Sequence, residues 1–482
     1  MQLITQDDFL LVRDNIDIIN KNIRKTIMNI FNPTLEDRKK IFNIIKTYIK
    51  KNDRKIYGGY ALNELLKIKN SKIYEDFELP DIDFYSHDPN TDIINICNEI
   101  YDSGFIKVSG REAKHKNTYS IFVNYELYCD ITYVPKYIFD KIPVKIINNL
   151  KYVNPDFMII DYLKILTDPI CSNWRIEKSL NRLFKLNKYY PLNFIKESIN
   201  INNTDIDEFI KNSIDDIISY IKNKNELIMI GFYAYNYFVA NSYINCIKCI
   251  DIPFVEIITK NYSDDINNIL KLLKNKYTDL DITYKEYYPF STYTGFLCEI
   301  YIEDELILVV YDYNEKCVPF QTIKFNDDEK DKINIGTFSL TLLYGYINIF
   351  RHKVFNYKEM KEVYEKFVSH LVQIRNIYFK QNNDNLLGKN IFRDFITDCI
   401  YPDYNPEFEN LIRYEKRKNN NKPSMYIYDP NKNRKDEKAI NFSFANISGN
   451  EIKNIKHSKL NNNDKISEDE CIGNEYIEND KN

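Results

Sequence analysis

The feature that most restricts the fold of this chain is a pair of adjacent glycines together with an Asp-x-Asp tripeptide. The tripeptide follows the glycines after about twenty residues. The two stretches read YGGYALN (57–63) and LPDIDFYS (79–86). Glycine is rare here, with 11 among 482 residues, so an adjacent pair indicates a backbone turn or a close approach that a side chain would prevent. Apolar runs predict short strands at 55–57 and 82–85, and helical spacing predicts a helix at 61–68. The predicted order is strand, Gly-Gly turn, helix and strand.

Other segments extend this order into an α+β domain. Residues 6–30 have helical spacing, and Thr34 with Asp37 has the capping-box pattern at the start of a helix that should end near Lys50. Beyond the Asp-x-Asp strand, the same patterns predict a helix at 91–102 and strands at 105–109, 118–124 and 127–134. A strand, a tight turn, a helix, a strand and then an antiparallel group are typical of the α+β class.

The glycine pair is a candidate phosphate-binding turn. Gly58 and Gly59 lie where the backbone must turn sharply and where N–H groups at the start of a helix point outward. Because neither residue has a Cβ atom, a phosphate can approach the backbone closely, which suits a nucleoside triphosphate. The alternative is a tight turn that packing alone requires.

The aspartates carry the stronger chemical signal. Asp81 and Asp83 are alternate residues of a strand, so their side chains point to one face, where two carboxylates repel each other unless a cation binds them. Asp130 interrupts the apolar strand LYCDITYV and supplies a third carboxylate. Three such groups suit a pair of Mg²⁺ or Mn²⁺ ions that promote phosphoryl transfer. The spacing recurs at 205–207 and 279–281, but without a preceding Gly-Gly turn and helix, and we expect exposed charge there.

The ordered set resembles the polymerase-beta-like nucleotidyltransferases. In the stretches KIYGGYALNELL, SKIYEDFELPDIDFYS and VNPDFMIIDYLKILTDP, the chain resembles more particularly the poly(A) polymerase catalytic subunits of large cytoplasmic DNA viruses, of the mimivirus, asfarvirus and poxvirus type. At the level of motifs the resemblance covers roughly residues 50–195, and it is weaker through about residue 445.

The resemblance implies a role for each matching residue. Gly58 and Gly59 correspond to the family's glycine motif, Asp81 and Asp83 to its paired metal ligands, and Asp130 to its third ligand. The resemblance further implies ATP as substrate, a single-stranded RNA 3′ end as acceptor, Mg²⁺ or Mn²⁺ as cofactor, and a location in the virion and the host cytoplasm.

Residues 230–270 repeat the first site at an offset of 173 residues. The pattern G-x-Y-A-x-N of 58–63 recurs at 231–236, which indicates an internal duplication. The residues that would carry chemistry are not repeated: in place of Gly59, Asp81, Asp83 and Asp130 stand Phe232, Phe254, Glu256 and Val309. We therefore expect a degenerate, inert second domain. The strand around Pro253 should lie beside the strand around Val309, and apolar side chains should fill the lost site.

Contacts to RNA require a local basic surface, because the net charge of the chain is −4. Residues 172–188 predict an amphipathic helix with Ile176, Leu180, Leu183 and Phe184 on its apolar face and Arg175, Lys178, Arg182 and Lys185 on the opposite face. Of these basic residues, we expect the first two to bind nucleotide and the last two to bind RNA. A second RNA-binding candidate is RYEKRKNNNK (413–422), with Arg413 and Lys416. An ordinary solvated surface is the alternative for both stretches.

We expect five parts along the chain: an N-terminal helical segment (1–50), a catalytic nucleotidyltransferase domain (51–195), a degenerate copy with helices (196–395), a basic segment (396–450) and a disordered tail (451–482). The acidic start predicts no signal peptide, and the longest apolar run, LIMIGFYAYNYFVA, is too short to span a membrane. The 9 scattered cysteines indicate reduced thiols.

These observations predict a template-independent polynucleotide adenylyltransferase that adds AMP from ATP to mRNA 3′ ends. One alternative is a terminal transferase that uses another nucleotide or acceptor, and another is a non-catalytic RNA-binding or scaffold subunit. The choice of adenine rests on the resemblance, since no residue pattern shows it. The large apolar second copy also suggests a homodimer.

Overall fold

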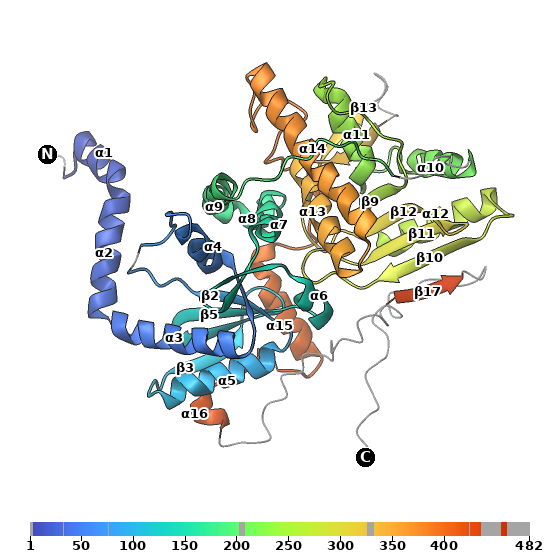
Figure 1. Ribbon diagram of the computed structural model, residues 1–482. Coiled ribbons are helices and arrows are strands. Elements are labelled where there is room, and N and C mark those ends of the chain that lie inside the picture. Colours follow the sequence, from blue (N-terminus) through green and yellow to red (C-terminus); the bar gives the residue numbers. More distant parts are fainter. Residues whose placement is uncertain are drawn as a thin grey trace, which may run out of the picture. The chain divides into compact units, whose positions relative to one another are not determined.

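The computed structural model describes residues 3–31, 33–75, 77–201, 208–324, 332–423, 425–434 and 455–459 (Figure 1). The chain forms two compact units. The first comprises residues 1–134, 143–154 and 409–444, and the second comprises residues 135–142, 155–408 and 445–482. Each unit contains one mixed β-sheet with helices packed against it, in agreement with the α+β class. Among the described residues, no helix has the length and apolarity that crossing a membrane requires.

The sheet of the first unit has the strand order β16-β3-β4-β5-β2-β1-β7-β6. Its strands are β1 (Lys55–Tyr57), β2 (Ile82–Ser86), β3 (Val108–Glu112), β4 (Thr118–Val123), β5 (Glu126–Tyr133), β6 (Val144–Ile147), β7 (Leu150–Val153) and β16 (Ile427–Tyr428). β1 pairs with β2 antiparallel and with β7 parallel, and β2 pairs with β5 parallel. The strands β1, β2 and β5, which carry the predicted site, are therefore neighbours.

Helices cover both faces of this sheet, with α4 on one side and α3 and α5 together on the other (Figure 1). α3 (Leu35–Lys51) begins with the predicted capping box, in which Thr34 and Asp37 exchange hydrogen bonds. α4 (Gly58–Lys67) starts earlier than predicted, because Gly58 takes a φ of +71° and passes directly from strand to helix. The remaining helices are α1 (Gln6–Asp14), α2 (Ile16–Ile30), α5 (Pro89–Asp102), α15 (Glu409–Asn419) and α16 (Pro430–Asn433).

The second unit is built on a sheet of order β15-β13-β14-β8-β9-β12-β11-β10-β17. Its strands are β8 (Leu227–Ile230), β9 (Val255–Thr259), β10 (Ile282–Tyr287), β11 (Leu297–Ile302), β12 (Glu305–Asp312), β13 (Val318–Lys324), β14 (Lys332–Gly336), β15 (Cys399–Ile400) and β17 (Ile455–Lys459). β17 pairs antiparallel with β10. It lies within the tail predicted to be disordered, and the rest of that tail is outside the described residues.

The helices of the second unit precede its strands in the sequence or lie between them. They are α6 (Lys136–Lys141), α7 (Pro155–Leu166), α8 (Pro169–Ser172), α9 (Ile176–Tyr189), α10 (Glu208–Ile221), α11 (Gly231–Ser242), α12 (Tyr262–Lys276), α13 (Phe338–Val354) and α14 (Lys358–Asn382), with 3-10 turns at η1 (Asn173–Arg175) and η2 (Pro406–Phe408). α11 follows β8 as α4 follows β1, with a glycine of positive φ at the start of each helix.

The two sheets share one topology. The order β3-β4-β5-β2-β1-β7-β6 corresponds strand for strand to β10-β11-β12-β9-β8-β14-β13, with the same parallel and antiparallel pairings. An irregularity is repeated as well, because the register shifts between Ile121 and Phe122 in the first unit and between Ile300 and Tyr301 in the second. The predicted duplication is confirmed, and it extends beyond the stretch 230–270 in which the sequence repeat is visible.

One polar contact is also present in both units. The Tyr48 hydroxyl donates to Asp92 at 2.8 Å, and the Tyr220 hydroxyl donates to Asp265 at 3.1 Å. Asp92 additionally accepts two hydrogen bonds from Arg54, at 2.7 and 2.8 Å. In each unit the contact joins the helix that follows the Asp-x-Asp position (α5 or α12) to the helix that precedes the glycine turn (α3 or α10). Because both units keep the contact, it serves the fold.

Phe232, Phe254 and Val309 are buried in the second unit. The rings of Phe232 and Phe254 meet edge to face with centroids 5.4 Å apart, and Tyr364 and Phe367 of α14 pack on Phe232. β9 and β12 are parallel neighbours, as the sequence predicts. The positions that correspond to the first site are therefore part of a hydrophobic core.

We expect Phe254→Ala to lower the free energy of unfolding of the second unit by about 3–5 kcal/mol, because the truncation leaves a cavity against the Phe232 ring. Chemical denaturation of the full chain, followed by circular dichroism, measures the change. Leu387→Ala is the control, since Leu387 is 72% exposed; its truncation should change the free energy by less than about 0.5 kcal/mol. Equal effects of the two substitutions would contradict the assignment of Phe254 to the core.

Candidate active site

The three predicted aspartates lie together in the first unit. Asp83 on β2 is paired with Asp130 on β5, and Asp81 immediately precedes β2. One carboxylate oxygen of each residue lies within 4.8 Å of those of the other two. All three residues are half-buried. The strand pairing thus brings to one point side chains that are widely separated in the sequence.

Gly58 brings its backbone against Asp83. A Cβ atom at position 58 would lie 2.2 Å from Asp83 Oδ2, and the φ of Gly58 is positive. Both the backbone conformation and this contact exclude a side chain. Gly59 follows in the first turn of α4, where it is buried. The start of α4, where backbone N–H groups favour negative charge, therefore adjoins the carboxylates.

Hydroxyl groups support the strand that carries Asp130. Ser120 on β4 donates from Oγ to Asp130 Oδ1 at 2.6 Å. Further along β5, the Thr132 hydroxyl lies 2.8 Å from the Tyr57 hydroxyl and 3.0 Å from the Thr118 hydroxyl. The sequence analysis did not identify Ser120. The one feature that could have pointed to it is its place opposite Asp130 in the hairpin of β4 and β5.

The carboxylates create a negative field within the sheet. Burial, and after it the charges of Asp130, Asp83 and Asp81, raise the pKa of the Cys129 thiol well above its usual value. Oxygen ligands at this spacing fit Mg²⁺ or Mn²⁺, which also relieve the repulsion among them. Among the described residues, this is the one group of three or more acidic, histidine or cysteine side chains close enough to hold a metal ion.

Comparisons with known proteins agree on one family. Residues 43–172 match the family model "Poly(A) polymerase catalytic subunit", and residues 184–462 match "APMV, Putative poly(A) polymerase, catalytic subunit, C-terminal". The "Putative poly(A) polymerase catalytic subunit" of Acanthamoeba polyphaga mimivirus is 30% identical over an alignment of 501 residues, which covers 96% of this chain and 86% of that protein. The chain belongs to the viral poly(A) polymerase catalytic subunits.

Two further relatives agree with this membership. A protein of the same name from African swine fever virus is 30% identical over 155 residues, which are 31% of this chain and 33% of that protein. The crystal structure of the Megavirus polyadenylate synthase matches with a TM-score of 0.83 and 32% identity, over 89% of this chain and 87% of that chain. The chain is therefore an enzyme, a poly(A) polymerase, with the mixed α+β organisation of that structure.

In this poly(A) polymerase, the second unit keeps the geometry of the first site without its carboxylate cluster. Glu256 pairs with Val309 as Asp83 pairs with Asp130. Gly231 has a φ of +59°, and a Cβ atom there would lie 1.8 Å from Glu256 Oε2. The approach of a glycine to an acidic side chain occurs in both units and is therefore a requirement of the fold.

Gly59 distinguishes the two units. Its counterpart is Phe232, whose buried ring packs on Phe254, the counterpart of Asp81. The second position of this helix thus accepts a large side chain without loss of the fold. Packing of the fold therefore does not by itself require a glycine at position 59.

Hydrogen bonds satisfy Glu256 in place of a cation. This buried carboxylate accepts from the Tyr311 hydroxyl at 3.2 Å, the Tyr364 hydroxyl at 2.9 Å and Asn348 Nδ2 at 3.0 Å. Burial raises the pKa of Glu256 to about 7, although the three hydrogen bonds oppose the shift. A single carboxylate with three donors offers no two-metal site.

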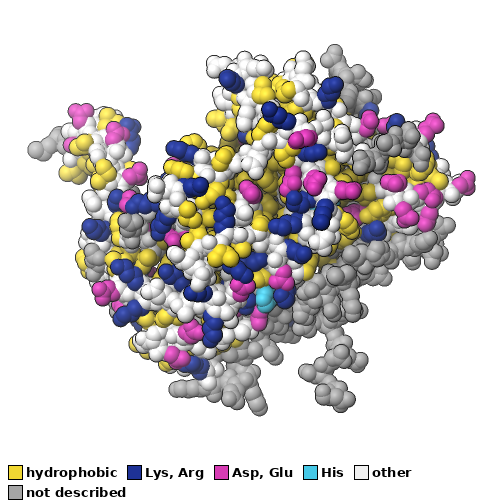
Figure 2. Space-filling view, viewed as in Figure 1, with side chains coloured by type: hydrophobic (Ala, Val, Ile, Leu, Met, Phe, Trp, Pro, Cys, Tyr) yellow, Lys and Arg dark blue, Asp and Glu magenta, His cyan; other side chains and the backbone are white. Residues whose placement is uncertain are grey.

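The predicted basic residues are divided between the two units. Arg175, Lys178, Arg182 and Lys185 lie on η1 and α9 of the second unit, whereas Arg413 and Lys416 lie on α15 of the first. Lys178 and Lys416 are exposed, and the other four residues are half-buried. Figure 2 shows basic side chains among acidic and apolar ones over the visible face, so charge alone does not mark an RNA path there. Their roles stay predictions.

The buried face of α9 differs from the predicted one. Phe184, expected on the apolar face, is 66% exposed, while Ser179 and Leu186 are buried. α9 packs against α7, and contacts of this kind, rather than apolar spacing alone, decide which face is covered. The prediction for Phe184 was wrong.

On α15, two arginines anchor the helix within the first unit. Arg413 donates to the Ala113 carbonyl at 3.0 Å, and Arg417 pairs with both carboxylate oxygens of Glu112, at 2.5 and 2.6 Å. Part of the basic stretch therefore has a structural use, which the sequence did not indicate. Lys416 is exposed on the same helix.

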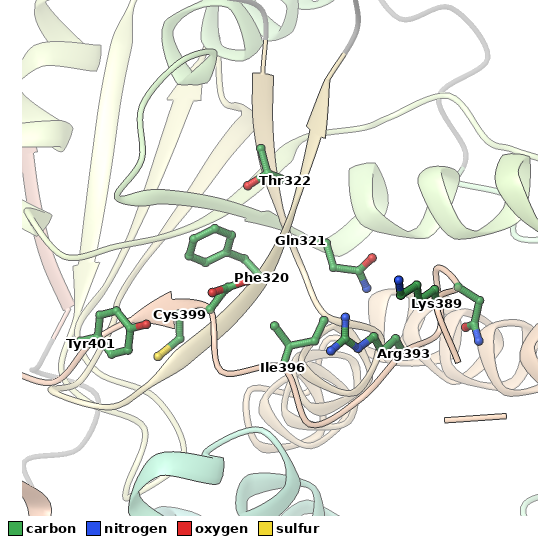
Figure 3. A pocket seen from close by; sticks show the side chains of 10 residues that line it. Phe320, Gln321, Thr322, Lys389, Arg393, Ile396, Cys399 and Tyr401 are labelled. Carbon is green, nitrogen blue, oxygen red and sulfur yellow. The ribbon is translucent and has the colours of Figure 1, made fainter. Parts of the chain in front are cut away.

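A cavity of about 590 Å³ lies in the second unit beside β13 and β15 (Figure 3). Lys389 and Arg393 lie toward one end of it and Tyr401 toward the other. None of the predicted site residues lines this cavity, so it is separate from the aspartate site.

We expect Glu256→Gln to change how the stability of the second unit depends on pH. The pKa of Glu256 is about 7 in the folded chain, against an ordinary 4.5, so the folded state binds this proton more tightly. The resulting stabilisation is complete below pH 4.5 and is lost as the pH rises to about 7. Over that range the free energy of unfolding of the variant should rise by about 3 kcal/mol relative to that of the wild type. Each pH unit between the two pKa values corresponds to about 1.4 kcal/mol.

Denaturation curves recorded below pH 4.5 and above pH 7 measure this difference. Asp279→Asn, which alters an exposed carboxylate, is the control and should show no comparable change. A free-energy difference between wild type and Glu256→Gln that is the same at both pH values would contradict the prediction.

Proposed function

We propose that this poly(A) polymerase adds AMP from ATP to mRNA 3′ ends without a template, by two-metal phosphoryl transfer at Asp81, Asp83 and Asp130. One comparison within the chain carries the proposal. Two units share a topology, and within the described residues the first alone holds three clustered carboxylates. The fold does not require that cluster, since the second unit is built without it. Chemistry is therefore the reason for it.

Each residue of the site would contribute in a defined way. Asp81, Asp83 and Asp130 would hold two divalent cations, which when bound supply charge stabilisation to the attacking hydroxyl and the departing pyrophosphate. Ser120 would keep Asp130 in a fixed orientation through its 2.6 Å hydrogen bond. Gly58 and Gly59 would bring backbone N–H groups at the start of α4 to the triphosphate.

Basic side chains would complete the substrate contacts. Arg175 and Lys178 would contact the triphosphate, and the RNA phosphates would be bound by Arg182, Lys185, Arg413 and Lys416. Such contacts make binding weaken with salt. We also extend to this chain the location that the family suggests, the virion and the host cytoplasm. Membership of an enzyme family and the intact aspartates argue against a non-catalytic scaffold.

Matched substitutions in the two units test the site. Asp83→Asn should lower extension of a labelled oligoribonucleotide at least about 100-fold, because metal sites supply several kcal/mol of transition-state stabilisation. Asp81→Ala and Asp130→Ala should have the same effect. Glu256→Gln, at the position of the second unit that matches Asp83, should extend RNA at a rate close to that of the wild type.

The assay uses the purified chain, Mg²⁺ or Mn²⁺, and each nucleoside triphosphate in a separate reaction. ATP should support long tails, and the other three should not. Tailing by any of the aspartate variants at close to the wild-type rate would refute the site. Equal extension with UTP or CTP would favour the rival, a terminal transferase with another nucleotide.

We propose further that the chain forms a homodimer through α1 and α2. The two helices and the residues beside them expose many large apolar side chains: Leu3, Ile4, Phe9, Leu11, Val12, Ile16, Ile18, Ile19, Ile23, Ile27, Ile30 and Phe31. An exposed apolar surface of this extent is typical of an interaction site. The apolar residues at the copied site, Phe232 and Phe254, are buried instead, and a second copy of α1 and α2 offers a matching apolar face.

Sedimentation velocity at micromolar concentration should show a dimer. Ile23→Asp together with Ile27→Asp should give a monomer, since unpaired charges in an apolar interface oppose association. Lys25→Asp, on the same helix, is the control and should stay dimeric. A wild-type chain that sediments as a monomer would contradict the proposal.

A further inference from the structure

The chain contains one tryptophan, Trp174, and it lies at the surface. It occupies the 3-10 turn η1 and is 65% exposed. Tryptophan buries most of its surface in folded proteins, so an exposed ring at this place needs an explanation. The guanidinium of Arg175 lies 4.3 Å from the ring centroid, which keeps a positive charge beside the indole.

A second exposed ring lies on the helix that follows. Phe184 on α9 is exposed, whereas the side chains that this helix buries are those of Ser179 and Leu186. Phe184 therefore does not contribute to the packing of α9. Two large rings are exposed within one short stretch of chain.

The same stretch has the opposite charge to the whole chain. Residues 169–190 contain one acidic side chain, Glu177, and five basic ones, Arg175, Lys178, Arg182, Lys185 and Lys188. The stretch therefore carries a net charge of +4, in a chain whose net charge is −4. Rings and cations are interspersed along it, and Lys188 also lies 5.6 Å from the ring centroid of Tyr189.

We propose that Trp174 and Phe184 form a base-stacking platform for the single-stranded RNA substrate, with Arg182, Lys185 and Lys188 of α9 contacting its phosphates. The inference rests on the proposed function in taking RNA as the substrate. Single-stranded nucleic acids present flat bases and a negative charge on each nucleotide, and proteins bind them with aromatic rings and cations together. A protein partner would not require the positive charge, and a membrane surface would require a wider apolar face.

Fluorescence of the full chain tests this directly, because Trp174 is its one tryptophan. Oligoadenylate added in buffer with EDTA, where no extension occurs, should quench the emission in a saturable way as a base stacks on the indole. The quenching should follow the binding curve of a labelled oligoadenylate measured by anisotropy. An abasic oligomer should bind with little quenching. Emission that stays constant while RNA binds, or equal quenching by the abasic oligomer, would overturn the proposal.

Substitutions give an independent readout. Trp174→Ala and Phe184→Ala should each weaken oligoadenylate binding by about 5- to 150-fold, the range for loss of one stacked base. Trp174→Phe keeps a ring and should restore most of the affinity. Tyr243→Ala is the matched control, because Tyr243 is 84% exposed in the same unit but outside the basic stretch.

The outcomes separate this inference from the proposed function. Wild-type affinity in both alanine variants, with poly(A) synthesis intact, would refute the platform and leave the proposed function standing; the surface would then suit a protein partner or a membrane. A wild-type chain that neither binds nor extends RNA would refute the proposed function, and the platform with it.

Discussion

The close approach of Gly58 to Asp83 organises the site of this poly(A) polymerase. At Gly58, β1 has just ended and α4 begins. The side chain of Asp83 on β2 lies against the backbone there and leaves no room for a Cβ atom at position 58. Pairing of Tyr57 with Asp83 across β1 and β2 fixes this approach, and the parallel pairing of β2 with β5 then puts Asp130 beside Asp83. Two strand registers therefore determine where the carboxylates meet.

The second unit shows which parts of the arrangement the fold requires. The glycine of positive φ, the acidic side chain against it and the strand register are repeated. Asp81, Asp130 and Gly59 are not repeated, and large apolar side chains occupy two of their positions. A duplicated unit without the carboxylate cluster thus separates, within one chain, the residues that the topology needs from those to which we assign the reaction.

The two units also differ in how the carboxylates at this strand register are satisfied. A carboxylate in a protein interior is stable only when donors or counterions replace water. In the second unit Glu256 has three hydrogen-bond donors, and Glu299 pairs with Arg351 at 2.6 Å. In the first unit Asp81, Asp83 and Asp130 are half-buried and gathered at one point, which accords with a site that cations complete. The same strand register thus accommodates a densely packed core in one unit and, in the other, the metal site that we propose.

Short-range patterns were enough to predict the local elements and the residues of the aspartate site. The capping box at Thr34, the strand–glycine–helix order and the offset of the repeat each depend on neighbours along the chain. Long-range packing settled the rest: the exposure of Phe184, the three donors that satisfy Glu256, and the anchoring of α15 by Arg413. In each case the deciding partner comes from a distant segment, as Ala113 does for Arg413. Spacing along the chain shows which face of a helix is apolar, but the helices and strands that pack against it decide which side chains are covered and which polar groups find partners.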